Sequence, residues 1–385
     1  MFSPTNGAAT RRQAVIFKSK VDTLFTAVRK TAAATDKKSS KNILILGNVL
    51  LKLDGDTLTI TGTDTEIEVR ATTSVEGIEN GEITADAEKL SKILGGLPKD
   101  AEVSISLNPD EKVIVKSGRS RFQIATLPAE DYPALEKPSI LLSFGIEATT
   151  LAKLLSKVSY AMAAQDVRYY LNGVFLELSG ENLIAVATNG HRLAYAETTN
   201  FKNEIIERFG ITIPRKAVLE MTKELKGMQG EIAVGVYESQ IKIATREYSI
   251  TTKLINGTFP EYMGVFPQNP QKTLIANKEL LLKAINRAYV LSNKNNKGVL
   301  LRLSKDMLLL SAANQSQEEY EEELPVQYDD NEFEIGFNLG YLSDALGSCE
   351  TDEVELHFND EKSSVLLVGH GQEDNQKNVV MPMRF

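Results

Sequence analysis

Three segments of the chain share one pattern of alternating apolar and polar residues, interrupted near the middle by a polar turn. They begin at Val49, Val174 and Val299, so consecutive copies lie 125 residues apart. Leucine stands at three equivalent places in every copy, at positions 51, 53 and 58 in the first. Alternation on both sides of a turn is typical of a β-hairpin with one buried face. The chain therefore contains a threefold repeat built around a hairpin.

An amphipathic helix is predicted before each hairpin, because apolar residues recur there three and four positions apart. The three apolar stripes are Val21, Leu24, Phe25 and Val28; Leu151, Leu154, Leu155 and Val158; and Leu281, Ala284, Ile285 and Ala288. Polar side chains that can accept a hydrogen bond from a first helical turn stand near the start of each stripe. We expect Ser19, Thr149 and Asn277 to be the caps.

A second helix is predicted after each hairpin, near residues 86–97, 215–226 and 339–347. Alternating strands follow, for example from Ala101 and from Glu231. The pattern predicts an α+β fold of three repeated domains, each with two helices packed on antiparallel sheets.

Proline-bearing stretches around residues 133–139 and 260–270 are the predicted domain boundaries. They divide the chain into residues 1–140, 141–270 and 271–385. A length of 385 residues with 42% hydrophobic residues is enough for several cores.

The sequence favours a cytoplasmic protein. Cys349 is the only cysteine, which excludes an intramolecular disulfide and fits a reducing compartment. No apolar run approaches the roughly 18–20 residues of a membrane helix. The first twelve residues are polar and end in Arg11 and Arg12, without the apolar stretch of a secretory signal. We expect them to form a short mobile extension.

Positive charge is concentrated in the predicted helices, although the chain as a whole carries −9. Residues 11–41, 272–297, 151–168 and 215–226 have net charges of +7, +5, +2 and +2. If these helices share one side of the molecule, that side is basic and the sheet side is acidic. A basic helical surface suits a phosphate backbone contacted without base readout.

Residues typical of catalysis or metal binding are missing from the sequence. His191, His357 and His370 form no pair at a metal-ligand spacing, and neither HExxH nor a phosphate-cradling GxxxxGK[ST] occurs. The segment from Gly369 to Gly371 lacks the third glycine of a dinucleotide fingerprint, so we interpret it as a turn between strands. The run Glu318–Glu323 is interpreted as a solvated acidic strand and loop. The sequence thus predicts no catalytic residue, no cofactor and no metal.

Several motifs resemble the bacterial DNA polymerase III beta subunit, the sliding clamp family, from about Gln13 to Phe385. They are ILGN from Ile45, LTITGTD from Leu58, SGRSRF from Ser117, LPAEDYP from Leu127, QDVRYYLNG from Gln165, ATNGHRLA from Ala187, FPEY from Phe259 and VVMPMRF from Val379. The resemblance implies a non-catalytic processivity factor, a head-to-tail homodimeric ring of six domains around duplex DNA. It also implies nucleoid association and partners that dock by short peptide motifs: replicative polymerase, clamp loader and repair proteins.

The resemblance further implies three sets of functional residues. The partner-peptide pocket comprises Tyr170, Leu171, Thr188, Gly190, His191, Arg192, Leu193, Pro260, Val265, Ser364, Val380, Met381, Pro382, Met383 and Arg384. The DNA-facing residues are Lys37, Lys38, Lys41, Lys153, Gln165, Arg168, Tyr169, Arg215 and Lys216. At the dimer interface the family places Val290 and Leu291, and charge complementarity adds Lys89, Arg119 and Arg121 opposite Glu318, Glu319 and Glu321.

Four features depart from the family pattern. Asn189 stands where Asp is usual, and Phe385 where the family ends in Leu. The loop at residues 37–41 differs, and the first twelve residues have no counterpart.

Two other functions stay open at this point. An enzyme acting on DNA, such as a nuclease, would need a carboxylate cluster for Mg²⁺. A DNA-binding module that forms no ring would be monomeric at micromolar concentration.

Overall fold

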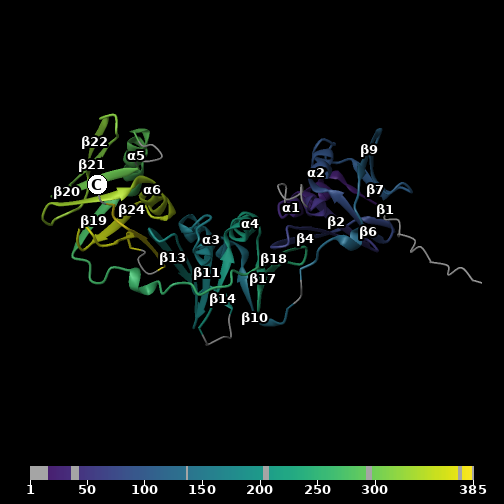
Figure 1. Cartoon of the computed structure of the whole chain (residues 1–385), viewed down its shortest axis with the longest axis horizontal. Helices are drawn as coiled ribbons and strands as arrows, with labels where there is room; N and C mark the ends of the chain where they lie inside the picture. Colours follow the sequence, from purple (N-terminus) through teal and green to yellow (C-terminus); the bar gives the residue numbers. More distant parts are fainter. Residues whose placement is uncertain are drawn as a thin grey trace, which may run out of the picture. The chain divides into compact units, whose positions relative to one another are not determined.

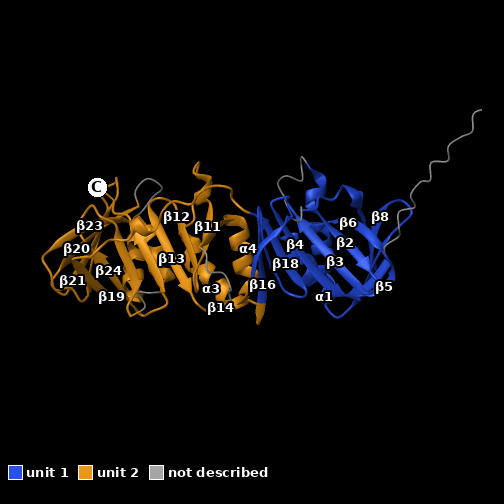
Figure 2. Ribbon diagram, turned by 90° about the horizontal axis from the view of Figure 1, so that it is seen from below, with its two compact units in different colours: residues 1–143, 232–253 blue, residues 144–231, 254–385 orange. Residues whose placement is uncertain are grey.

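The computed structural model describes residues 16–35, 43–135, 138–202, 208–291, 297–371 and 375–383. The expected extension, residues 1–12, lies outside these ranges, as do Lys37, Lys38, Lys41 and Arg384. The chain forms two compact units, coloured separately in Figure 2. Unit 1 contains residues 1–143 and 232–253, and unit 2 contains residues 144–231 and 254–385.

Unit 1 contains strands of two antiparallel sheets. The first has the order β5 (Glu76–Glu79), β1 (Ile16–Lys20), β7 (Glu102–Leu107), β8 (Lys112–Ser117) and β9 (Ser120–Ala125). In the second, adjacent strands are β16 (Glu231–Tyr237), β17 (Gln240–Ala244), β18 (Tyr248–Lys253), β4 (Ile67–Ser74), β3 (Thr57–Thr63), β2 (Asn48–Asp54) and β6 (Gly81–Asp86). Helices α1 (Val21–Ala32) and α2 (Ala87–Gly95) lie beside each other (Figure 1).

Unit 2 is built around an eight-stranded sheet. Its order is β15 (Phe209–Pro214), β11 (Gly173–Ser179), β12 (Asn182–Thr188), β13 (Arg192–Thr198), β26 (Gln376–Val380), β25 (Val365–Gly369), β24 (Glu353–Phe358) and β19 (Lys272–Asn277). A four-stranded sheet has the order β22 (Glu319–Pro325), β21 (Met307–Ala313), β20 (Gly298–Ser304) and β23 (Phe333–Asn338). A short pair, β10 (Ile140–Glu147) and β14 (Phe201–Lys202), is antiparallel too.

Four helices belong to unit 2 and pack in pairs. Helix α3 (Ala148–Val158) contacts α4 (Arg215–Leu225), and α5 (Lys278–Ala288) contacts α6 (Leu339–Ser348). Each helix turns its apolar side inward. In α3 and α5 the predicted stripe residues are all buried. The sequence pattern therefore located both the helices and their core-facing sides.

The threefold repeat is confirmed at the level of single residue pairs. The hairpins are β2–β3, β11–β12 and β20–β21, and each has a leucine pair next to its turn: Leu53–Leu58, Leu178–Leu183 and Leu303–Leu308. All six leucines are at most 2% exposed. Equal register and equal burial show that the three copies form the same structural unit.

Two of the three predicted N-caps are wrong. Ser19 belongs to strand β1, and Thr149 lies inside α3, whose N-cap position is Glu147. The residues before these helices, Lys20 and Glu147, have extended backbone and make no side-chain capping hydrogen bond. Asn277 is confirmed, because its Oδ1 accepts a hydrogen bond of 3.0 Å from the Leu280 amide. Sequence reasoning missed Asn338, which accepts from two amides at the start of α6.

Three further assignments can also be compared with the structure. Strand β25 ends at Gly369 and a turn follows, as predicted for the Gly-His-Gly segment. Arg119, expected on a strand, lies in the turn between β8 and β9, while Arg121 is on β9. The acidic run is confirmed as a strand, β22.

One strand pairing joins parts of the first and second predicted segments. Strand β18 pairs with β4, with Tyr248 opposite Ala71, so residues 232–253 group with unit 1. The division of the chain at residues 140 and 270 stays a prediction.

Candidate functional site

An apolar cluster lies beneath the strand ends of β12, β13 and β26 in unit 2. Its buried members include Leu171, Leu193, Phe259 and Val379. The Phe259 ring stacks on Phe175 with centroids 4.8 Å apart. Aromatic stacking of this kind gives a rigid base for surface residues above it.

The C-terminal strand brings two distant parts of the sequence together at this cluster. In β26, Val380 lies opposite Arg192 of β13. Beyond the strand, the Met381 amide donates to the His191 carbonyl at 2.9 Å. The Met383 amide then donates a hydrogen bond of 2.8 Å to the Gly336 carbonyl, which forms an isolated β-bridge between the two residues.

The sequence-predicted pocket residues therefore come from several strands and loops of one unit. Met381, Met383 and Val265 are about 40% exposed (40, 37 and 37%), so apolar side chains remain open to a ligand. Ser364 Oγ donates to the Val265 carbonyl at 3.1 Å, which connects two of these loops. Of the remaining predicted members, Leu171, Leu193 and Val380 are buried and Pro260 is exposed.

A tight turn from Thr188 to Arg192 forms the polar side of this surface. Asn189 Oδ1 accepts hydrogen bonds from the His191 and Arg192 amides at 3.0 and 3.2 Å. A carboxylate oxygen would accept the same bonds, so Asn in place of the usual Asp keeps the turn. Gly190 has a φ of +87°, and a Cβ there would lie 2.9 Å from Arg168. The turn therefore requires glycine at this position.

Arg168, predicted to face DNA, supports this turn. Its guanidinium binds Asp166 through two hydrogen bonds of 3.0 and 2.8 Å and also donates to the Asn189 carbonyl at 3.1 Å. Hydrogen bonds from Arg168 lower the pKa of Asp166 to about 2. Much of the positive charge of Arg168 is therefore already compensated within the protein.

Arg192 connects β13 with α6. Its guanidinium lies between the rings of Tyr160 and Tyr341, with centroids 5.1 and 4.7 Å away. Nη1 is 2.5 Å from Asp344 Oδ2, and Nη2 donates to the Tyr160 carbonyl. The His191 ring stacks on Tyr341, one of these two rings, with centroids 6.1 Å apart. Sequence reasoning missed Tyr160, Tyr341 and Asp344, because none belongs to the quoted motifs and only the fold brings them to Arg192.

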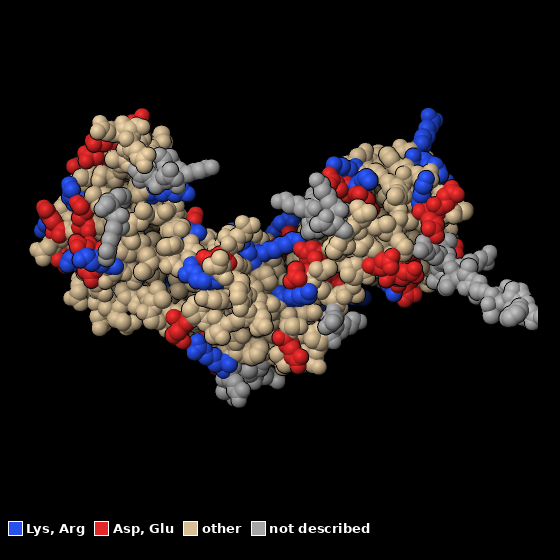
Figure 3. All heavy atoms as spheres, viewed as in Figure 1, with Lys and Arg blue, Asp and Glu red and all other residues tan. Residues whose placement is uncertain are grey.

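The basic helices are partly neutralised by nearby carboxylates. Lys153 Nζ is 2.7 Å from Glu350, and that interaction lowers the pKa of Glu350. Lys223 pairs with Glu220 at 3.0 Å and with Glu224 at 3.4 Å. Lysine and arginine side chains still gather over α3 and α4 (Figure 3).

The remaining DNA-facing residues of unit 2 lie near this basic area. Tyr169 is 58% exposed, and Gln165 is exposed with a φ of +57°. Arg215 Nη1 donates to the Met162 carbonyl at 3.3 Å, whereas Lys216 is on the exposed side of α4.

The residues expected at a dimer interface lie on or next to the edge strands β9 and β22, on helix α2 and in the turn of helix that follows α5. Arg121 is on β9, the edge strand of its sheet, and Lys89 on α2 pairs with Asp86 at 3.3 Å. Val290, in the short 3₁₀ helix Tyr289–Leu291, is 82% exposed. Glu319 and Glu321 are exposed on edge strand β22, and Glu318 binds Asn314 at 2.5 Å.

No obvious reactive centre is found in the described ranges. Within them, no three His, Cys, Asp or Glu side chains converge in a way that could hold a metal ion. His357 and His370 both bind the buried Glu355 instead. None of the helices in the described ranges has the length and apolar character that crossing a membrane requires.

Comparisons with known proteins agree with this arrangement. Family models of the DNA polymerase III beta subunit match along the chain: the N-terminal domain at residues 16–136, the central domain at 145–261 and the C-terminal domain at 263–384. The beta sliding clamps of Pseudomonas putida and of Escherichia coli K12 are 41% and 40% identical over 342 residues. In each case, 89% of this chain and 92% of the relative are covered.

A crystal structure of the DNA polymerase III subunit beta from Pseudomonas aeruginosa has a TM-score of 0.92 and 38% identity, covering 96% of this chain and 100% of that one. A Pseudomonas aeruginosa sliding clamp bound to griselimycin has a TM-score of 0.91 and the same identity. The chain belongs to the DNA polymerase III beta subunit family, the beta sliding clamps, and is a non-catalytic DNA sliding clamp of replication with three clamp domains.

Proposed function

We propose that two copies of this chain join head to tail and encircle duplex DNA, each contributing the segments 1–140, 141–270 and 271–385 as domains. Two open sheet edges of opposite charge carry this proposal. The ring tethers the replicative polymerase, and its loader and repair partners dock through short peptides. DNA and the polymerase are the binding partners of a sliding clamp.

The first open edge is β9. It is the last strand of its sheet, and all its residues except Ile124 are exposed. Side chains alternate between the faces of a strand, so Ser120 and Phe122 share the side of Ile124. Arg121 and Gln123 point to the other side. An exposed edge of this length requires a covering partner or protection against unwanted pairing.

The second open edge is β22. Tyr320 and Glu322 on one face are held by α5, through the Ala284 carbonyl and the Arg287 guanidinium. The alternate residues Glu319, Glu321 and Glu323 form an exposed acidic row on the other face.

If β9 pairs with β22, in either the antiparallel or the parallel direction, each face of one strand continues a face of the other. If their core-facing sides align, Arg121 meets the acidic row, since both lie on the face opposite the core. Phe122 then lies on the helix side, where exposed Val290 follows α5. Exposed ion pairs contribute only about 0–1 kcal/mol each, so apolar contact and backbone bonds supply most of the stability. Charge sets which edges meet.

The methionine-bearing surface of unit 2 supports peptide docking. Met381, Met383 and Val265 are open, while the cluster beneath them is packed. Methionine side chains adapt to different apolar anchors, which suits a surface with several partners. We further propose that its peptides bind as short apolar segments beside His191 and Tyr341.

A topological assay tests the ring. Clamps are loaded by a clamp loader onto nicked circular DNA, which is then linearised in half of the sample. We expect retention on circles and loss from linear DNA, with a sedimenting mass of two chains before loading. Equal loss from both DNAs, or a monomer at micromolar concentration, would contradict the proposal.

A further inference from the structure

Asn378, in the middle of strand β26, is a polar residue with no exposed surface. Burying an amide is unfavourable unless its polar atoms form hydrogen bonds. The Nδ2 group donates to the Leu367 carbonyl at 3.3 Å and to Cys349 Sγ at 3.6 Å. The Oδ1 atom accepts from the hydroxyls of Tyr160 and Ser348, at 2.8 and 3.3 Å. One side chain therefore connects strand β25, the end of helix α6 and the segment that follows α3.

Tyr160 links this asparagine to the methionine-bearing surface. It belongs to the short 3₁₀ helix Ser159–Ala161, directly after α3. Burial raises the pKa of its hydroxyl, so at neutral pH the group is protonated and donates to Asn378. The Tyr160 ring lies 5.1 Å from the Arg192 guanidinium, and the Tyr160 carbonyl accepts from Arg192 Nη2. The position of Arg192, at the end of the turn that contains His191, therefore depends on where Tyr160 is held.

The second ring beside Arg192 has an additional anchor. Tyr341 lies in the first turn of α6, and Ser348 is the last residue of that helix. Gln376 Nε2 donates to the Ser348 carbonyl and hydroxyl at 3.0 and 2.9 Å. Helix α6 is thus held by two buried amides of β26, and the Tyr341 ring depends less on Asn378 than the Tyr160 ring does.

We propose that Asn378 is a positioning residue of the methionine-bearing surface, which it acts on through the Tyr160 hydroxyl. The inference rests on the peptide docking proposed above, although the buried Asn378 side chain itself touches no peptide. Without this hydrogen bond only a fraction of the molecules holds Tyr160 and Arg192 in place, and the apparent peptide affinity falls by that fraction. A buried hydrogen bond changes an equilibrium constant about two- to twelvefold, so we expect a loss of that size.

Three variants of the full-length protein separate positioning from general stability. Tyr160→Phe keeps the ring and the carbonyl beside Arg192 and removes only the hydroxyl. Asn378→Leu removes the acceptor at nearly constant volume. Gln376→Leu is the matched control, because it also replaces a buried amide of β26 but leaves the bond between Tyr160 and Asn378 in place.

The first measurement follows the His191 ring by NMR. The sequence contains only three histidines, and His357 and His370, which both bind Glu355, serve as internal controls. We expect the His191 signals to shift in Tyr160→Phe, in Asn378→Leu and equally in their combination. They should stay in place in Gln376→Leu, although thermal unfolding should show a loss of stability there too.

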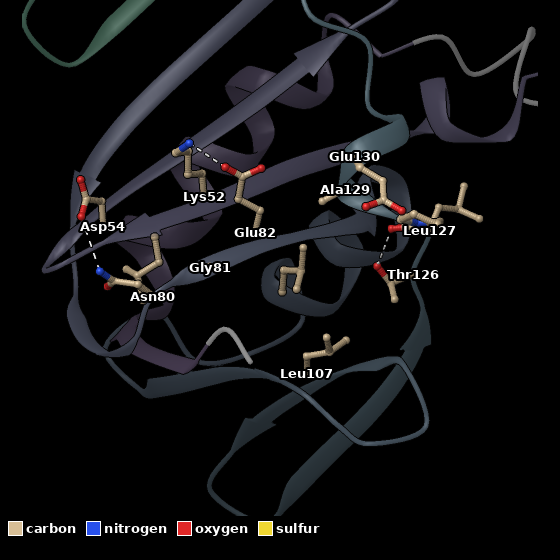
Figure 4. Close-up of a pocket in the computed structure, with 13 residues that line it drawn as sticks. Lys52, Asp54, Asn80, Gly81, Glu82, Leu107, Thr126, Leu127, Ala129 and Glu130 are labelled. Atoms are coloured by element: carbon tan, nitrogen blue, oxygen red, sulfur yellow. Dashed lines mark hydrogen bonds and ion pairs between the residues drawn. The ribbon is translucent and has the colours of Figure 1, made fainter. Parts of the chain in front are cut away.

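The second measurement is fluorescence anisotropy with a labelled synthetic hexapeptide that carries leucine and phenylalanine as apolar anchors. Affinity should fall about two- to twelvefold in each single variant and no further in their combination. A cavity of about 420 Å³ in unit 1, which has Leu107 on one side and the ion pair of Lys52 and Glu82 on another, offers the peptide a competing place (Figure 4). Leu107→Ala should leave the affinity unchanged.

The outcomes distinguish this inference from the docking on which it rests. His191 signals and affinity like those of the wild type in both single variants would overturn the positioning role. Additive losses, or an equal change in Gln376→Leu, would overturn it too. If Asn378→Leu does not fold, Tyr160→Phe alone decides. If the wild type binds no peptide, or only Leu107→Ala weakens binding, the proposed docking fails, while the His191 signals still test whether Asn378 positions the turn.

Discussion

The Arg192 guanidinium and the Asp344 carboxylate form an ion pair of 2.5 Å that connects strand β13 to helix α6. The arginine side chain is only 10% exposed, whereas the aspartate is half exposed at 51%. Two tyrosine rings enclose the cation. The contact therefore orients the Thr188–Arg192 turn, which contains His191, relative to Tyr341. His191 and Tyr341 are the two aromatic residues beside the proposed peptide surface.

Arg192→Met should loosen this connection and lower the affinity for a partner peptide about tenfold. The substitution keeps the apolar stem but removes the ion pair and the bond to the Tyr160 carbonyl, and a charged hydrogen bond contributes about 1.5–3 kcal/mol. Calorimetric peptide titration measures the effect. Asp344→Asn is the matched control, with a smaller loss expected because its side chain is hydrated. Equal losses in both variants would show that the ion pair, and not the enclosed guanidinium, is decisive.

Met383→Ala should lower peptide affinity about tenfold without affecting the fold. The side chain is 37% exposed, so its truncation removes a contact surface and leaves little cavity. Leu171→Ala should also weaken binding, but Leu171 is 2% exposed and its loss should cost stability as well, about 2–5 kcal/mol. Fluorescence titration and thermal unfolding separate the two effects. Met307→Ala, on the β21 hairpin, should change neither affinity nor melting temperature substantially.

Val290→Ala combined with Leu291→Ala should give a folded monomer, because these residues supply apolar contact at the proposed seam. Arg119→Glu with Arg121→Glu should weaken the dimer, more at low salt than at high salt, since exposed charges are screened. Sedimentation equilibrium across a salt series measures both variants. Adding Glu321→Arg to Arg121→Glu should recover part of the association. A stable dimer in the double-alanine variant would place the seam elsewhere.

Glu350→Gln should strengthen DNA binding. The carboxylate lies 2.7 Å from Lys153 and 3.9 Å from Lys157, so its neutralisation releases two cations for phosphates. Each new phosphate contact steepens the dependence of log K on log salt by about 0.9. We expect a steeper slope by about 1–2 in anisotropy titrations. Glu361→Gln, which removes a carboxylate paired with Lys362, is the control. An unchanged slope would remove Lys153 from the DNA-facing set.

Asp166 should titrate near pH 2, below its usual 3.8, because Arg168 donates hydrogen bonds to its ionised form. A carboxylate with a lowered folded pKa stabilises the fold above its unfolded pKa and loses that contribution as pH falls through the folded value. Support for the Thr188–Arg192 turn should therefore be intact at neutral pH and lost between about pH 4 and 2. Carboxyl NMR titration measures the midpoint. Arg168→Met should return it toward 3.8, and a wild-type midpoint already at 3.8 would contradict the assignment.

Local periodicity alone determined the repeat, the three hairpins and the core-facing sides of the helices. The leucine pairs next to the hairpin turns follow from alternation, because a strand has a period of two and a slip of one residue would expose its apolar face. Helix starts were less predictable. Ser19 and Thr149 have suitable side chains, but whether a residue caps a helix depends on where the preceding strand ends.

Only the tertiary structure decided which charges remain available and which residues meet. From the sequence, Lys153 is expected to be a free cation. In the structure Glu350, almost 200 positions later, lies beside it. The contacts of Arg192 with Tyr341 and Asp344 arise because β26 adds to β13 and brings α6 close. A sequence pattern indicates which kinds of contact each residue is able to make. The pairing of distant segments determines which partner each residue contacts, and this pairing leaves no local signature in the sequence.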